Sequence, residues 1–199
     1  MRRADQHGAR RRRAAAGTVT AEFALVITLF LAVVCGVVEI ARLLYIFNTL
    51  QVVTHRAAAA AANADFSDGA AMSGVRQRAI FRASAGTLTL GAPVTDAHIR
   101  IDYLALSDAG GGAMNEIPTG SLPSCPANNR VTCMRNPYDS SCIKMVRARI
   151  CDPADTGQCV RVAYQPMFSF IAIPLSLPTA PAVMTAETLG APPGQAPCP

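Results

Sequence analysis

The stretch EFALVITLFLAVVCGVVEIARLLYIF, residues 22–47, decides the fold of this chain. Sixteen of its residues, 23–38, carry no charge, and the apolar character resumes after Glu39 and continues to Phe47. The 25 residues from Phe23 to Phe47 form a helix about 37 Å long, whereas the hydrocarbon core of a bilayer is about 30 Å thick. The sequence therefore predicts one helix that spans a membrane.

Arginine placement predicts the orientation of this helix. Residues 1–17 contain six Arg and one Asp, so they hold the whole net charge of +5, and only Arg42 and Arg56 lie near the far end of the span. Because basic flanks stay in the cytoplasm, we expect a cytoplasmic N-terminus and an exported C-terminal part. A cleaved secretory signal begins in the same way. It is disfavoured because the apolar stretch is long and VVEIARLL (37–44) offers no small-residue cleavage site.

Charge and motif content exclude several functional classes. Beyond residue 17 the chain holds 12 basic and 12 acidic residues, with Lys144 as its one lysine, whereas nucleic-acid binding requires clustered basic residues. The sequence contains no phosphate-binding loop, nucleophile elbow or His-Glu-x-x-His motif. We expect His55 and His98 to be packed or exposed side chains. The expectation is a non-enzymatic protein with no catalytic residue, metal site, cofactor, nucleic-acid partner or small-molecule substrate.

Cysteine content indicates an oxidising compartment. The chain has seven Cys, of which Cys35 lies in the apolar segment as a lipid-facing or helix-packing thiol. No Cys-x-x-Cys motif is present, so disulfides are favoured over zinc or redox centres. Six cysteines allow 15 pairings, and the sequence leaves these open. The candidate disulfide cysteines are Cys125, Cys133, Cys142, Cys151, Cys159 and Cys198.

The remaining patterns predict a small α+β head with an antiparallel sheet. Helical character continues through 48–62, which contains no Pro or Gly and ends in six alanines. A second helix is predicted at 70–84, and residues 107–141 are predicted to form a long surface excursion held by Cys125 and Cys133. Alternating apolar residues predict strands at 87–90, 98–106, 143–150 and 160–164.

These patterns divide the chain into four segments. Seven of the 14 prolines fall in the last 26 residues, so an extended or irregular tail is expected there. The predicted segments are a basic leader at 1–17, the transmembrane helix with its outer extension at 18–63, the disulfide-stapled head at 64–177 and a Pro-rich tail at 178–199.

The junction RRRRAAAGTVTAEFALV, residues 10–26, resembles the type IV prepilin signals of tight-adherence (Flp-type) pilus systems. The resemblance implies that a prepilin peptidase cuts between Gly17 and Thr18, which leaves Glu22 and Phe23 as the fifth and sixth residues of the mature chain. It also implies that Glu22 offsets the N-terminal amine of a neighbouring subunit. From its position alone, Glu22 is equally an anion in the first turns of a helix.

The helix itself is similar to the TadE-like minor pilins, or pseudopilins, through residues 22–62, and LSLPTAPAVMTAE (175–187) resembles the ending of that family. Glu39 and Arg42 form an i,i+3 charge pair, either solvated at the lipid boundary or used in assembly. The resemblance implies a minor pilin of the bacterial inner membrane, with its head in the periplasm or outside. Its partners would be the prepilin peptidase, other pilin-like subunits and the pilus assembly platform. The alternative is an unprocessed single-pass protein whose disulfide-rich head binds a ligand.

Overall fold

The computed structural model describes residues 4–107, 112–155, 157–170, 174–192, 194 and 196–198, with side chains from residue 19 onward. The chain divides into two compact units. One comprises Met1–Leu43 with Pro166–Ala172, and the other comprises Leu44–Gln165 with Ile173–Pro199. We call them the anchor unit and the head unit.

Helix α1 (Ala4–Ala61) is continuous and contains no proline. In the anchor unit, the described residues from Val19 to Val34 are exposed on every side of the helix. In the head unit, α1 instead buries one stripe with spacings of three and four residues, which is the pattern of an amphipathic helix. The fully buried residues of that stripe are Ile46, Leu50, Val53, Ala57 and Ala61.

The head unit contains a four-stranded antiparallel sheet in the order β2-β1-β3-β4. The strands are β1 (Ile99–Ser107), β2 (Ala113–Glu116), β3 (Met145–Ile150) and β4 (Ala182–Thr185). Two short 3-10 helices, η1 (Asp96–His98) and η2 (Thr119–Ser121), precede β1 and follow β2. The prediction of an α+β head with an antiparallel sheet behind a long N-terminal helix is therefore confirmed.

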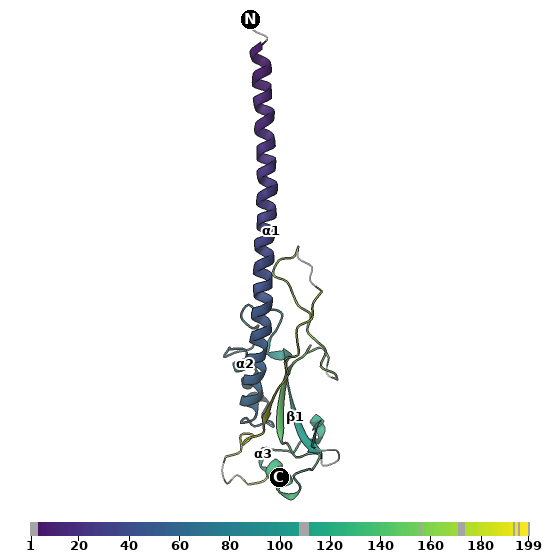
Figure 1. Cartoon of the computed structure of the whole chain (residues 1–199). Helices are drawn as coiled ribbons and strands as arrows, with labels where there is room; N and C mark the ends of the chain where they lie inside the picture. Colours follow the sequence, from purple (N-terminus) through teal and green to yellow (C-terminus); the bar gives the residue numbers. More distant parts are fainter. Residues whose placement is uncertain are drawn as a thin grey trace. The chain divides into compact units, whose positions relative to one another are not determined.

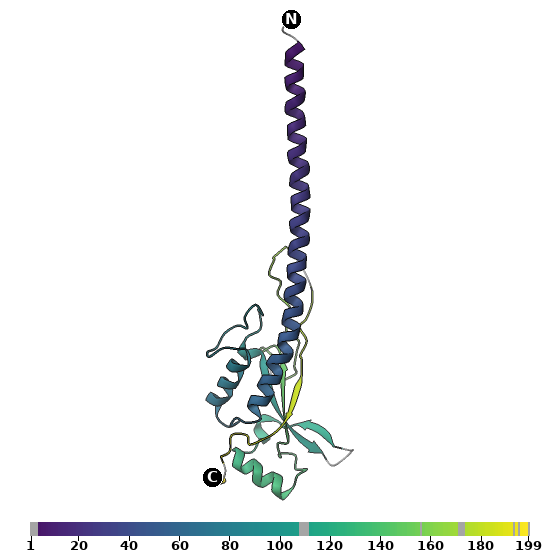
Figure 2. The same ribbon diagram turned by 60° about the vertical axis from the view of Figure 1, so that its left-hand side comes forward.

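Strand alternation places the core on one face of this sheet. Tyr103 of β1 lies opposite Val146 of β3, and both are buried against the end of α1 and against α2 (Gly69–Ala79). Figures 1 and 2 both show α2 beside the last turns of α1. Asp68 caps the N-terminus of α2, because its side chain accepts a hydrogen bond from the Ala70 N–H. The other face of the sheet carries the charged residues of β1 and β3.

Three disulfides staple the head, as the cysteine content predicted. Two of them close short loops, Cys133–Cys142 and Cys151–Cys159, across sequence separations of 9 and 8. The third, Cys125–Cys198, joins residues 73 positions apart and fixes the C-terminal segment beside α3 (Pro126–Arg135). Cys35 is free and partly exposed.

Two predicted strands are wrong. Residues 87–90 make one isolated bridge, Thr87 to Thr95, because Leu90 has a positive φ of 57° and turns the chain. Residues 160–164 likewise make one bridge, Ala163 to Ser176. Their alternation of apolar and polar residues reflects the alternate burial of side chains in an irregular segment.

The remaining differences concern element boundaries and elements that the sequence did not predict. The helix predicted at 70–84 ends at Ala79, because Phe81 adopts a positive φ of 62°. The excursion predicted at 107–141 contains β2 and α3, and its two cysteines pair outside it, with Cys198 and Cys142. Strand β4 lies within the segment assigned to the Pro-rich tail and pairs with β3.

Candidate functional site

The junction residues all lie within α1. The backbone of Gly17 and Thr18 is helical, while the side chain of Thr18 lies outside the described part of the structure. Glu22 and Phe23 are exposed, and among the side chains that the structure describes none forms an ion pair with Glu22. Its carboxylate therefore faces outward from this part of the helix, where a group from another molecule can reach it.

Beyond the junction, the anchor helix presents apolar side chains around its whole circumference. Large apolar residues from Leu25 through Val38 are exposed, and an 18-residue window of the helix reaches a mean hydropathy of 2.7. A helix that is apolar on all sides requires an apolar surrounding, and here the protein itself covers little of it. Within the described residues, Val19–Ala61 is the one helix that is long and apolar enough to cross a membrane. It provides the membrane anchor.

Glu39 ends the uncharged run and is 1% exposed. The sequence predicted its pairing with Arg42, and the structure places Arg42 Nη1 3.5 Å from the Glu39 carboxylate. The backbone N–H of Met167 also donates to both carboxylate oxygens, at 3.2 Å to Oε1 and 3.1 Å to Oε2. A buried carboxylate needs such donors because removing a charged group from water costs free energy that hydrogen bonds must offset.

Sequence reasoning missed Met167 and its neighbours. The sequence feature that could have pointed to them is a run without charge, because no charged residue occurs from Val162 to Ala186. Within this run, Met167, Phe168 and Phe170 follow Pro166 without the period of a helix or strand. Such a run predicts apolar contact but does not identify the surface that it contacts.

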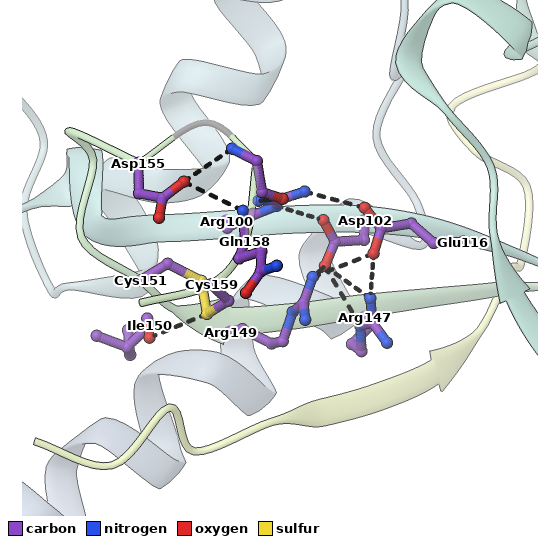
Figure 3. The surroundings of a disulfide bond; sticks show 11 residues. Arg100, Asp102, Glu116, Arg147, Arg149, Ile150, Cys151, Asp155, Gln158 and Cys159 are labelled. Carbon is purple, nitrogen blue, oxygen red and sulfur yellow. Dashed lines mark hydrogen bonds and ion pairs between the residues drawn. A yellow bond between two sulfur atoms is a disulfide. The ribbon is translucent and has the colours of Figure 1, made fainter. Parts of the chain in front are cut away.

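The outer face of the sheet carries a charge network in which three arginines surround two carboxylates (Figure 3). Asp102 accepts hydrogen bonds from Arg100 Nε at 2.9 Å, from Arg147 Nη2 at 3.2 Å and from Arg149 Nε at 2.8 Å. Glu116 of β2 pairs with the same arginines, including Arg100 Nη2 at 3.0 Å. The hydrogen bond to Asp102 is the largest cause of the raised pKa of Arg100. These contacts connect β1, β2 and β3.

A groove of about 970 Å³ runs along β1 and α2 in the head unit. Two of its titratable groups, His98 and Tyr103, contact neighbouring residues of the head unit. Thr95 donates its backbone N–H to Nδ1 of His98 at 3.0 Å, and burial lowers the pKa of that imidazole. The Tyr103 hydroxyl lies 3.6 Å from Met72 Sδ, and burial raises its pKa. No group of three metal-ligating side chains occurs among the residues with described positions.

The three disulfides bear on the compartment of the head. Disulfides persist in oxidising compartments and are rare in the reducing cytosol. A disulfide-bonded head behind an N-terminal membrane helix is the arrangement of a membrane-anchored protein with an extracytoplasmic domain.

Comparison with known proteins concerns this same helix. The model of the TadE-like protein family matches residues 17–62. The match begins at Gly17 of the junction, includes Glu22, Glu39 and Arg42, and ends one residue after the end of α1. No curated protein and no solved structure matches the chain. Residues 17–62, which form the anchor helix and its extension into the head unit, are therefore similar to the TadE-like protein family.

Proposed function

We propose that this chain is a minor pilin or pseudopilin that takes part in assembly of a tight-adherence (Flp-type) pilus or a related secretion system. The observation that carries the proposal is the family match, which begins at the glycine of a prepilin-type junction and covers the membrane helix. The similarity of residues 17–62 to the TadE-like family is consistent with a non-enzymatic component of a Tad pilus. The proposed partners are a prepilin peptidase, other pilin-like subunits and the assembly platform.

Cleavage after Gly17 would change the energetics of the anchor. The leader holds a net charge of +5 beside the start of the span, and these charges stabilise the helix on the cytoplasmic side of the membrane. Once residues 1–17 are removed, the helix begins at Thr18 with one new ammonium group. The processed helix is then easier to extract from the bilayer into an assembly.

Glu22 would supply the complementary charge. It lies four residues after Thr18, about one helical turn away, and its side chain is exposed. The cost of a charge in a membrane helix reaches about 2.5–3.5 kcal/mol at the helix centre on insertion scales, and Glu22 lies at the end of the span. In a bundle of processed helices, the Thr18 amine of a neighbouring subunit would offset that cost.

The test is the mature N-terminus, measured by mass spectrometry of the membrane-extracted protein. We expect the wild-type chain to begin at Thr18, whereas Gly17→Leu blocks the cut and keeps Met1 or its formylated form. Gly8→Leu, a glycine substitution inside the leader, is the matched control and should still yield Thr18. A wild-type chain that retains Met1, or that begins at another residue, would contradict the proposal.

A second candidate is an unprocessed single-pass protein whose head binds a ligand. The groove of about 970 Å³ along β1 favours it, because Arg100 and apolar residues such as Phe66 and Tyr103 line the same space. The two candidates differ in the fate of the leader. A chain that keeps residues 1–17 and never leaves the membrane would support the ligand-binding candidate.

A further inference from the structure

A charge-free loop of the anchor unit exposes large apolar side chains. In its described part, Pro166–Phe170, Met167 is 51% exposed and Phe170 is 67% exposed. Phe168 packs on Phe170 with ring centroids 5.6 Å apart. Aromatic side chains have large apolar surfaces whose exposure to water is unfavourable. The loop therefore needs a surface to cover these side chains.

The contact with Glu39 specifies the level of this loop along the anchor helix. The Met167 N–H donates to the Glu39 carboxylate at 3.1 and 3.2 Å. Glu39 directly follows the uncharged run 23–38, so it lies in the half of the apolar segment 23–47 that is farther from the basic leader. The loop therefore lies near the level at which α1 leaves the hydrocarbon layer, within the same compact unit as the span.

The helix surface at this level is also apolar and exposed. Val37 and Ile40, on either side of Glu39, are 61% and 59% exposed. These side chains continue the surface that the bilayer covers on the rest of the span. Met167 and Phe170 thus extend an apolar helix surface that lipid already surrounds. The charge of Glu39 is shielded from the lipid by Arg42 and by the Met167 N–H.

We propose that the loop Pro166–Phe170 is a second membrane-contacting element, which inserts Met167 and Phe170 into the headgroup–acyl boundary of the leaflet at the Glu39 end of the span. Phenylalanine and methionine gain from burial at this depth, and the loop holds no charge that would have to be desolvated. The contact sets the depth of the anchor independently of leader cleavage.

The natural chain contains no tryptophan, so one substitution creates a unique fluorescent reporter. The reporter variant is Phe170→Trp, and the matched control is Tyr138→Trp, an aromatic position of the head that is 50% exposed. Each full-length protein is reconstituted at high lipid-to-protein ratio into phosphatidylcholine vesicles whose acyl chains are brominated at shallow or deep positions. We expect a blue-shifted emission and at least twofold quenching by shallow bromines for Phe170→Trp, with little quenching for Tyr138→Trp.

Two results would overturn the proposal. One is emission from Phe170→Trp that is as water-like and as weakly quenched as that of the control. The other is a blue shift that grows with protein density in the membrane without bromine quenching, which would assign the loop to a protein partner. Met167→Trp provides a second reporter if Phe170→Trp does not reconstitute. Because the leader plays no part in this measurement, its result is independent of the Gly17 test.

Discussion

Asp102 is the residue on which the outer face of the sheet depends. The register places Arg100 of β1 directly opposite Arg149 of β3, and like charges in opposed positions destabilise a sheet. Asp102 accepts hydrogen bonds from both of these arginines and from Arg147, and its side chain is 4% exposed. The buried carboxylate of Asp102 therefore offsets the repulsion between Arg100 and Arg149 and stabilises this strand register.

Replacing this carboxylate tests that role. We expect Asp102→Asn to lower the free energy of unfolding by about 2–4 kcal/mol, because three partly buried arginines lose a shared anion. The control is Glu116→Gln, which affects the same arginines from a side chain that is 38% exposed. Solvent weakens that interaction, so a loss below about 1 kcal/mol is expected. Urea denaturation of the detergent-solubilised chain, followed by circular dichroism, measures both, and equal losses would contradict the role of burial.

At the scale of elements, the sequence predicted most reliably the segments whose own pattern is strong. The alternation around Ile99, Ile101 and Tyr103 predicted β1, and the run at 143–150 predicted β3. Helix α3 was missed because five of the ten residues of PANNRVTCMR are polar and because Cys133, inside the helix, is bonded to Cys142 beyond it. Strand β4 was missed because its four residues gain their stability from pairing with β3 rather than from local propensity.

The disulfides should differ in their contributions to stability. Cys125–Cys198 closes a loop with a sequence separation of 73, whereas Cys151–Cys159 closes one with a separation of 8. Chain entropy predicts losses of about 4 and about 2.5 kcal/mol, respectively, when each pair is replaced by serine. Thermal and urea unfolding of the two double variants provide the comparison. A larger loss for the short loop would show that chain entropy does not govern these bonds.

At the scale of the whole molecule, the leader arginines should control which way the chain crosses the membrane. In intact spheroplasts, we expect an external protease to digest the head and to spare the N-terminus, because basic flanks stay inside. Replacing Arg10–Arg13 with alanine leaves two arginines on each side of the span, so a mixed orientation is expected. Heads of inverted chains would stay reduced, which gel mobility after thiol alkylation detects. A uniform orientation of this variant would contradict the arginine rule here.

The sequence by itself determined the anchor helix, and it predicts the orientation of that helix and a prepilin-type junction. Each of these depends on local composition, because a bilayer acts on the length and charge of one segment. Only the tertiary structure decided the cysteine pairing, the network around Asp102 and the contact between Glu39 and Met167. These features join residues up to 128 positions apart, and such contacts arise from packing that no local pattern encodes.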